Sequence, residues 1–539
     1  MAAISFAAGC APAWLGQSPA HAGVHSAAAD CVSVATDGSM SNQDAVIESD
    51  LFLKRSGLVV LGSAAGSMAY RAVPSCLALA ISVCLAGQVR AADADTPVTI
   101  RLAQGSSALP ILSSPSTVAA PPDGASFARY ESLRVKGWNI NVAGPADTVD
   151  REAFGARAAL ADQGIGYLAY TNDFFADNLL RHGHPLSNSR TNQVYSGQLP
   201  TYLVSGFGFL TYDLSRYGVP DGQVVVGGTA VNTDWNPLGP RTASLGTASY
   251  YQTFLNKRLE LKVGYFANGL EFLGTYVGGS LASGVFGPNA SIPVEQGQNS
   301  LVFATPGINL KANFPGNIYT KLGVQRAISP DGSIVENQQN PSAVRFSVPN
   351  AGAFIIDETG YRVPATPGGP QTWIRAAGSY TTSNYQNFDR PGQRSNHNYG
   401  AYLLADRQLL QTAPAAGTAA RGVYAGFSFM FAPPALNRFS QYYEGRLYGL
   451  GLIPGRPFDL ISFVATSNVF SQNLVAATRA AGRRAHSSSE AYTVSYSAHV
   501  YPGVNLNFGV SYIDNPTPVA FSGNSGSGLN ILAGTVTFF

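Results

Sequence analysis

The chain of 539 residues has few charged side chains and no long apolar run. Asp, Glu, Lys and Arg make up 12% of it, whereas an average soluble domain carries about 25% charged residues. The formal net charge is only +2, which gives no basic footprint for nucleic acid. No segment outside residues 76–86 approaches the ~20 apolar residues of a membrane-spanning helix. Neither nucleic-acid binding nor an inner-membrane function is therefore expected.

Cysteine is confined to the start of the chain. Cys10, Cys31, Cys76 and Cys84 are the only four, so a disulfide scaffold or a cysteine-based metal site is excluded after residue 84. A cysteine-free body is usual for an exported protein that crosses an oxidising compartment.

A signal peptide is predicted at residues 68–91. Arg71 supplies a short basic region, and residues 76–86 supply the apolar region. Val89 and Ala91 then occupy the −3 and −1 positions of a cleavage site. Export to the cell envelope follows from this leader.

The position of this leader within the chain is unusual, because export machinery acts on the first segment to emerge. We interpret residues 1–67 as a mis-assigned upstream extension and Met68 as the true start. A genuine pre-sequence is the alternative. From the predicted cleavage site, the mature chain is expected to begin at Ala92.

Glycine and aromatic residues are abundant, with 58 Gly, 26 Tyr and 28 Phe, and they accompany short alternating segments. In residues 259–265 the odd-numbered residues are apolar, and the even-numbered residues 258–264 are Arg, Glu, Lys and Gly. Alternation predicts β-strands, because side chains of a strand point to opposite faces with period two. Further strands are predicted at residues 202–212, 374–380, 423–431 and 504–512.

The last ten residues, 530–539, predict a strand that runs to the end of the chain at Phe539. Termini of soluble domains are normally frayed. A transmembrane barrel must instead pair its last strand with its first, since an open edge in lipid leaves backbone groups unsatisfied. We therefore expect Phe539 at the lipid–water interface and the chain in a bacterial outer membrane.

The predicted fold is an all-β transmembrane antiparallel barrel of about 16 strands that occupies residues 151–539. At ~10 residues per strand plus connections, the length suits 14–18 strands, of which 16 is our choice. Residues 92–150 are predicted to be a flexible N-terminal arm, because residues 92–125 are rich in Pro, Ser and Ala. Residues 151–163, which end before Gly164, are the only convincing helix of the mature chain.

Charged residues on a polar strand face are the sharpest functional candidates. Arg258, Glu260 and Lys262 would form a stripe on the lumen wall, where charges of both signs make a transverse field and offer hydrogen bonds to a polar solute. A solvated wall without a constriction role is weighted equally. The full set of pore-lining or substrate candidates is Arg258, Glu260, Lys262, Lys321, Arg375 and Arg157.

The chain resembles the carbohydrate-selective porins of the OprB family over about residues 150–539. The elements that carry this resemblance follow one another along the chain. They are residues 154–165, residues 254–265 followed by Glu271 and Phe272, residues 405–410, residues 455–459 and residues 512–516.

This resemblance implies a 16-stranded outer-membrane channel for mono- and small oligosaccharides. Its partners would be sugars and outer-membrane lipid and lipopolysaccharide, with monomer and homotrimer both open. Two departures concern sugar preference. Gly155-Ala-Arg157 stands where the family has Gly-Gly-Arg, and Gly264-Tyr265 stands where it often has Gly-Lys.

Catalytic and energy-coupling motifs are absent from the sequence. There is no Gly-x-Ser-x-Gly elbow, no His-Glu-x-x-His and no P-loop, so no enzyme and no cofactor is expected, and transport should be passive diffusion. His182 and His184 are interpreted as solvated loop residues rather than metal ligands.

Two alternative functions stay open. One is a barrel lipid hydrolase with His486 beside Ser487–Ser489; the other is a non-conducting structural barrel, for which a long mouth loop at residues 330–370 would suit equally well.

Overall fold

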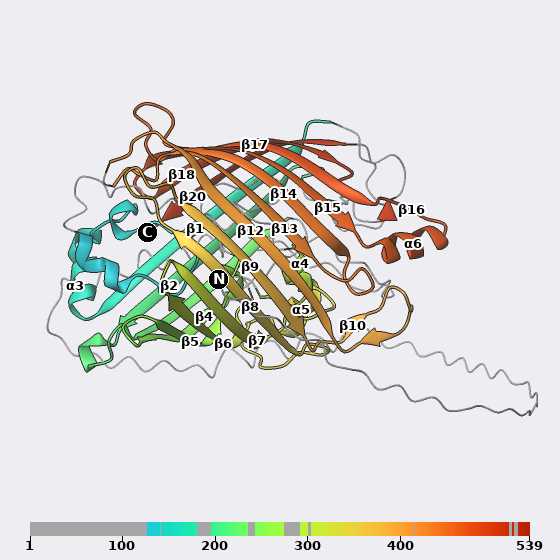
Figure 1. Ribbon diagram of the computed structural model, residues 1–539, viewed down its shortest axis with the longest axis horizontal. Helices are drawn as coiled ribbons and strands as arrows, with labels where there is room; N and C mark the ends of the chain where they lie inside the picture. The colour runs from blue at the N-terminus through green and yellow to red at the C-terminus, as the bar shows by residue number, and fades with distance from the viewer. Residues whose placement is uncertain are drawn as a thin grey trace, which may run out of the picture. The chain divides into compact units, whose positions relative to one another are not determined.

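A computed structural model of the chain describes most residues from Phe127 onward (Figure 1). The described ranges are residues 127–140, 142–180, 195, 197–234, 243–273, 291–299, 303–415, 417–516, 520–521 and 527–539. The predicted upstream extension, the signal peptide and residues 92–126 of the predicted arm lie outside them, as do His182 and His184. All described residues belong to one compact unit, Met68–Phe539.

Sixteen strands of the described residues form one closed antiparallel barrel, as predicted. The first half runs β1 (Ile165–Asn178), β2 (Thr201–Asp213), β3 (Gln223–Thr233), β4 (Ser244–Phe254), β5 (Leu259–Phe266), β6 (Thr305–Phe314), β7 (Ile318–Arg326) and β8 (Ala353–Val363). The second half runs β9 (Thr372–Thr381), β12 (Asn398–Gln411), β13 (Gly422–Phe431), β14 (Phe439–Leu450), β15 (Leu460–Phe470), β17 (Ser488–Tyr501), β18 (Val504–Asp514) and β20 (Gly528–Phe538). Each strand pairs with its neighbours in this order, so the predicted strands are confirmed.

The last strand closes the barrel on the first. β20 pairs with β1 from Tyr170 opposite Phe538 to Asn178 opposite Asn530. The backbone N–H of Phe539 donates to the carbonyl of Ala169 at 2.7 Å. No edge is left at this seam, which is what a sheet surrounded by lipid requires.

Connections differ in length between the two ends of the barrel. At one end they range from residues 502–503 to residues 412–421, and at the other they extend to residues 267–304. Figure 1 shows the C-terminus and α3 at the first end, and α6, β10 and β16 at the second. Short turns face the periplasm in outer-membrane barrels, so we call the first the periplasmic end and the second the outer end.

Apolar side chains point outward and polar side chains point into the barrel. On β5 the side chain of Val263 is 41% exposed on the outer face, while Lys262 beside it is 3% exposed. Leu322 on β7 and Val510 on β18 are likewise outward, at 45% and 47%. This arrangement is the reverse of a soluble sandwich, whose apolar face is buried, and it suits a wall against lipid.

Short helices and two small sheets occupy the connections. They are η1 (Ala128–Leu133), η2 (Pro145–Asp147), η3 (Ala153–Gly155), α3 (Ala156–Asp162), η4 (Ser215–Tyr217), η5 (Asn268–Leu270), α4 (Ser291–Glu295), α5 (Ser333–Gln339), α6 (Gln472–Ala480), the pair β10 (Tyr385–Gln386) with β11 (Arg394–Ser395), and the pair β16 (Arg484–Ala485) with β19 (Ala520–Phe521). Within the described ranges, no helix has both the length and the apolar character to cross a membrane.

Two expectations about these connections need correction. The predicted helix at residues 151–163 shortens to α3, and it is not the only helix, because α4, α5 and α6 form as well. Residues 330–370 are not one long mouth loop, since they contain α5 and β8. Burial alternates along residues 353–363 with the period of a strand, but the sequence does not, since Phe354, Ile355 and Ile356 are consecutive apolar residues.

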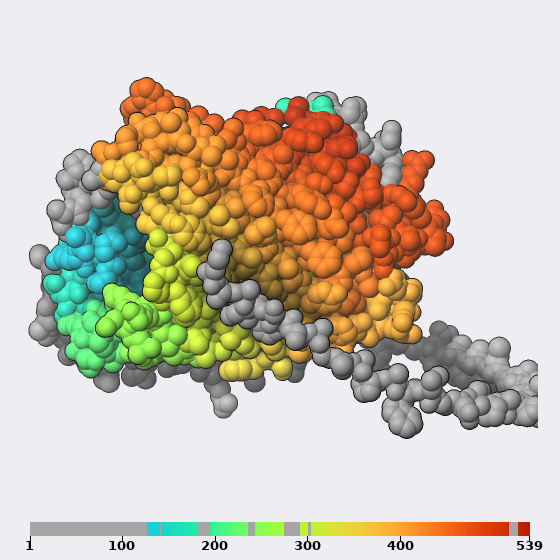
Figure 2. Space-filling model, in the orientation of Figure 1, coloured from blue at the N-terminus to red at the C-terminus, as the bar shows by residue number. Residues whose placement is uncertain are grey.

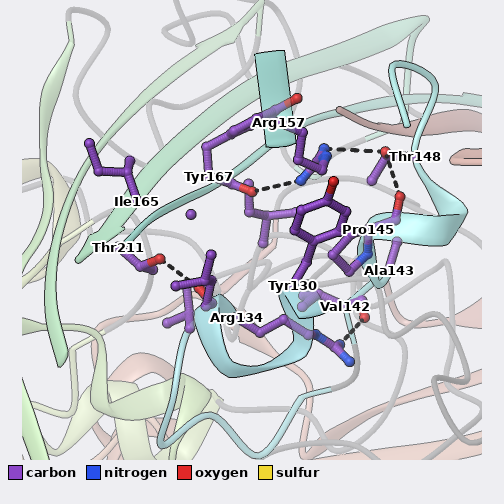
Figure 3. Close-up of a pocket in the computed structure, with 14 residues that line it drawn as sticks. Tyr130, Arg134, Val142, Ala143, Pro145, Thr148, Arg157, Ile165, Tyr167 and Thr211 are labelled. Atoms are coloured by element: carbon purple, nitrogen blue, oxygen red, sulfur yellow. Dashed lines mark hydrogen bonds between the residues drawn. The ribbon is translucent and has the colours of Figure 1, made fainter. Parts of the chain in front are cut away.

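The predicted flexible arm includes a part with defined contacts. Residues 127–140 and 142–150 contain η1 and η2, and Tyr130 and Leu133 are buried. Figure 2 shows the first described residues, in blue, gathered at one end of the barrel. Figure 3 shows Arg134, Pro145 and Thr148 packed near the beginning of β1. The apolar residues of this stretch give it a surface to bury, which the composition of residues 92–125 did not suggest.

Candidate pore constriction

Glu260 and Lys262 project from β5 into the barrel, because the register of the strand places its even-numbered residues inward. The Lys262 ammonium lies 2.6 Å from Oε1 of Glu271, and both side chains are only 3% exposed. Lys262 Nζ also lies 5.3 Å from the centre of the Phe266 ring. A buried lysine therefore has a carboxylate partner on the inner wall.

Glu260 is the centre of a second hydrogen-bonded group, closer to the periplasmic end. Its Oε1 accepts from Lys311 Nζ at 2.8 Å and from Asn313 Nδ2 at 2.7 Å. Its Oε2 accepts from the Tyr251 hydroxyl at 2.9 Å. Tyr251, Lys311 and Asn313 come from β4 and β6, so cross-strand neighbours on the inner face hold this carboxylate in place.

The connection between β5 and β6 folds inward against this wall. Leu270 and Phe272 are fully buried, and Asn309 Nδ2 on β6 donates both to Asn268 Oδ1 at 2.6 Å and to Glu271 Oε2 at 2.7 Å. Glu271 is thus carried by a loop segment, whereas its partner Lys262 is carried by the wall. We call residues 267–273 the constriction loop.

Lys321 and Arg375 hold the constriction loop through its backbone. Lys321 on β7 donates to the carbonyl of Glu271 at 2.7 Å, and Arg375 on β9 donates to the carbonyl of Leu273. The Arg375 guanidinium also lies 3.7 Å from Glu358 Oε2 on β8. Charged donors bound to carbonyls form strong hydrogen bonds when water is excluded, so these cations fix where the loop sits.

Helix α4, farther along the same connection, is bound farther round the barrel wall, from β12 to β14. Gln296 Nε2 donates to the carbonyl of Tyr399 on β12 at 2.6 Å. Oε2 of Glu295 accepts from the backbone N–H of Arg438 at 3.1 Å and of Phe439 at 3.2 Å, beside β14. Burial raises the pKa of the Glu295 carboxyl, and the nearby Arg438 guanidinium opposes this shift. The connection therefore contacts the wall at several strands between β5 and β14.

A further charged cluster lies on β12 and β14. Arg446 Nη2 lies 2.7 Å from Asp406 Oδ2, and Arg446 Nη1 lies 2.7 Å from Glu444 Oε1. Tyr448 donates to Asp406 Oδ1 at 2.9 Å. The sequence prediction missed this cluster, although the alternation of Tyr442, Glu444, Arg446 and Tyr448 along residues 442–448 is the same signal that identified β5.

Two of the predicted candidates lie away from this region. Arg258 is exposed in the turn before β5, because the strand begins only at Leu259. Arg157 is buried on α3, with Nη2 3.0 Å from Asp150 Oδ1 and its guanidinium 4.0 Å from the centre of the Tyr167 ring. Figure 3 shows Arg157 beside Thr148 and Tyr167, at the base of β1. Arg157 joins the helix to the barrel, and Arg258 faces solvent.

Of the six predicted candidates, Lys262 and Lys321 contact Glu271 and Arg375 contacts Leu273 of the same loop. Glu260 belongs to the neighbouring group on the same strand. Glu271 was noted only as part of the family resemblance, and its charge and its position after β5 were the available signal for a role in the lumen. Cations and anions in close alternation give a polar surface without a single dominant sign of charge. In the described part of the chain, no group of three or more His, Cys, Asp and Glu is placed to hold a metal ion.

Comparison with solved structures agrees with this fold. The high-pH structure of Pseudomonas putida OprB superposes with a TM-score of 0.60 at 15% sequence identity, and the match covers 73% of this chain and 98% of that one. The low-pH structure of the same protein gives a TM-score of 0.46 at 14% identity, over the same shares of the two chains. No curated protein sequence matched the chain.

A family model gives the stronger result. The model described as the carbohydrate-selective porin, OprB family, matches residues 181–535. These residues include fourteen of the sixteen barrel strands whole, most of β20 and the constriction loop. The chain therefore belongs to the OprB family of carbohydrate-selective porins.

Proposed function

We propose that this outer-membrane carbohydrate channel selects its solutes at a constriction formed by Lys262, Glu271 and the side chains that hold them. The channel carries sugars by passive diffusion and is not an enzyme. Lys321 and Arg375 position the constriction loop, and Glu260 with Lys311 extends the charged wall toward the periplasm. Arg258 and Arg157 are left out of the constriction, because the first is exposed in a turn and the second anchors α3.

The ion pair between Lys262 and Glu271 is the observation that carries this proposal. An ion pair that is 3% exposed on both sides loses much of its hydration, and such a pair persists only when further hydrogen bonds support it. Asn309 and Lys321 supply those bonds to Glu271. A loop held this firmly across a barrel sets the width of the passage beside it.

Neutral sugars are favoured over charged solutes of similar size on this wall. Carboxylates accept and ammonium groups donate, so the part-exposed Glu260 and Lys311 beside the buried pair can offer both kinds of hydrogen bond to hydroxyl groups. A charged solute that approaches a wall group of opposite sign also approaches a neighbouring group of its own sign. Repulsion by the second group then offsets attraction to the first. Selection then depends on size and polarity, with no energy source involved.

Reconstitution of the purified chain in planar bilayers tests the proposal. We expect a conductance that glucose and maltose reduce in a concentration-dependent manner, and sugar uptake by proteoliposomes that needs no energy source. Absence of conductance, or conductance that neither sugar reduces, would contradict the proposed function. Lys262→Ala should weaken this block by sugars. Leu261→Ala, which changes a side chain on the outer face of the same strand, is its matched control.

Two further proposals concern processing and surroundings. The mature chain begins at Ala92, and N-terminal sequencing of outer-membrane material should give Ala-Asp-Ala-Asp; a start before Met68 would overturn this. The outward apolar belt contacts outer-membrane lipid and lipopolysaccharide. Ultracentrifugation of the detergent-solubilised protein decides between a monomer and a homotrimer.

A further inference from the structure

A stretch of chain ahead of β1 reaches the constriction loop, although it lies outside the residues that the family model matches, 181–535. We call residues 133–140 the inner strap. It follows η1 directly and precedes η2. Its contacts run along the inner face of β2 and β3 and then pass to the constriction loop.

Polar side chains of the wall bind the backbone of the inner strap at its beginning. Thr211 Oγ1 on β2 donates to the carbonyl of Leu133 at 2.5 Å, as Figure 3 shows. Gln223 on β3 donates to the carbonyl of Arg134 at 2.9 Å and accepts from the backbone N–H of Lys136 at 3.1 Å. Both wall residues are buried, so these hydrogen bonds are shielded from water.

The middle of the inner strap joins it to the constriction loop. The Trp138 ring meets the Phe209 ring edge-on, with centroids 5.1 Å apart. The backbone N–H of Asn139 donates to the carbonyl of Leu270 at 2.8 Å. Asn139 Nδ2 donates to the carbonyl of Glu271. Asn139 is only 7% exposed, so its backbone N–H and its side-chain amide need partners within the protein. Both groups find them on the constriction loop.

Glu271 is the point where these contacts converge. Its carbonyl accepts from Asn139 and from Lys321, and its carboxylate meets Lys262 and Asn309. Lys262 Nζ also lies 3.4 Å from the carbonyl of Lys136 in the inner strap. The inner strap therefore touches both members of the ion pair, the anion through Asn139 and the cation through Lys136.

The chain that follows the inner strap is fixed at the periplasmic end. Asp147 Oδ1 lies 2.8 Å from His499 Nε2 and accepts from the backbone N–H of Gly503 at 2.8 Å. The backbone N–H of Val149 donates to the carbonyl of Phe538 at 2.8 Å. Residues 133–140 and 142–149 are thus held at the periplasmic rim by β17 and β20 and in the lumen by the constriction loop. Each attachment limits movement of the chain at the other.

We propose that the inner strap positions Glu271 through Asn139, and that the N-terminal segment thereby helps set the sugar selectivity of the pore. Asn139 is a positioning residue: it acts on solutes only through Glu271. The inference rests on the proposed function, since it concerns the same constriction. It adds a determinant that comes from outside the matched family residues.

Asn139→Ala in the full chain tests this role, with Ser132→Ala as the matched control, because Ser132 is exposed in η1 just before the inner strap. We expect Asn139→Ala to weaken sugar block of the single-channel current about two- to tenfold, the range that one net hydrogen bond supplies. Ser132→Ala should leave it unchanged. Heat-modifiability of both variants should match the wild-type chain, which shows that the barrel is intact.

A double-mutant cycle with Glu271→Gln shows whether Asn139 acts through Glu271. Because Asn139 acts on solutes only by placing the Glu271 carboxylate, the effect of Asn139→Ala on sugar block and ion selectivity should shrink when Glu271→Gln has removed that carboxylate. An unchanged sugar block in Asn139→Ala, or effects that simply add, would overturn the inference. If sugars block the wild-type current and the Asn139→Ala current equally, only this inference fails. If sugars do not block the wild-type current, the proposed function itself fails.

Discussion

The inner wall of β5–β9 differs in chemistry from the inner wall of β15–β18. The first carries Lys262 and Arg375, each with a carboxylate partner, and Lys321, which binds a backbone carbonyl. The second carries small hydroxyl groups that bond one another across strands, as in the 2.6 Å contact between Ser462 and Ser495. Thr493 and Ser511 make a similar contact at 2.9 Å.

The difference follows the path of the chain. Lys262, Lys321 and Arg375 stand where the constriction loop and the inner strap lie against the wall, and they bind the backbone carbonyls of those segments. A hydroxyl wall needs no such partner, because adjacent strands satisfy its donors and acceptors. One side of the barrel therefore holds inserted chain through charged side chains, whereas on the other side the hydroxyl groups bond one another across strands.

Removal of the carboxylate of the constriction loop should break this contrast most strongly. Glu271→Ala leaves the Lys262 ammonium buried without its partner, a change that typically costs ~3–5 kcal/mol. We expect the loop to leave the wall, single-channel conductance to rise and sugar block to be largely lost. Ser495→Ala on the hydroxyl wall is the control and should change neither quantity. Equal behaviour of the two variants in planar bilayers would refute the difference between the walls.

Alanine substitutions around β5 sharpen the comparison to single side chains. Lys262→Ala should weaken sugar block several-fold, since it removes one member of the buried pair. Arg258→Ala should have little effect because that side chain is exposed in the turn, and Leu261→Ala on the outer face should lower only insertion. Dose-response curves of sugar block for the three variants test this order. A strong effect of Arg258→Ala would return that residue to the constriction.

The cluster on β12 and β14 is expected to matter for stability more than for selection. Arg446→Ala leaves Asp406 and Glu444 without their shared cation, again at a cost of ~3–5 kcal/mol for a broken buried pair. The temperature at which the folded band is lost in heat-modifiability gels should fall clearly, while sugar block per inserted channel should change less than in Lys262→Ala. A barrel of normal heat stability would show that this cluster is not a structural one.

The smallest effect concerns pH and the docking of α4. Because burial raises the pKa of Glu295, the docked helix favours the protonated carboxyl. This contribution to stability is present at acid pH and is lost as the pH rises through the raised value, above the ordinary glutamate pKa of about 4.3. Glu295→Gln should therefore be more heat-stable than wild type at neutral pH, and the two should converge at acid pH. Glu131→Gln, at an exposed position, should show no such convergence.

The barrel could be predicted from the sequence because its strands follow a simple period. Alternation located β5, β9, β13 and β18, and the requirement for closure identified the last strand. The same period placed Glu260 and Lys262 on the inner face. Arg258 has the right parity but lies outside the strand, because Leu255, Asn256 and Lys257 adopt positive φ angles of 52°, 55° and 66° and turn the chain just before it.

The inserted segments could not be predicted in this way, since their positions depend on tertiary contacts. Nothing periodic in residues 133–140 or 267–273 indicates that they lie inside the barrel. The Asn139 donors and the Glu271 carbonyl meet only after β2, β5 and β7 have formed the wall around them. Composition predicted a flexible arm over residues 92–150. It could not reveal the wall and loop residues that bind the inner strap.

The ion selectivity of single channels tests the central claim most directly, because the two members of the pair carry opposite charges. Reversal potentials across a salt gradient should shift toward cations in Lys262→Met, which leaves the Glu271 carboxylate uncompensated, and toward anions in Glu271→Gln, which leaves the Lys262 ammonium uncompensated. The double variant should return close to wild type. Conducting variants with no shift, or with shifts of the same sign, would contradict a constriction built on this pair.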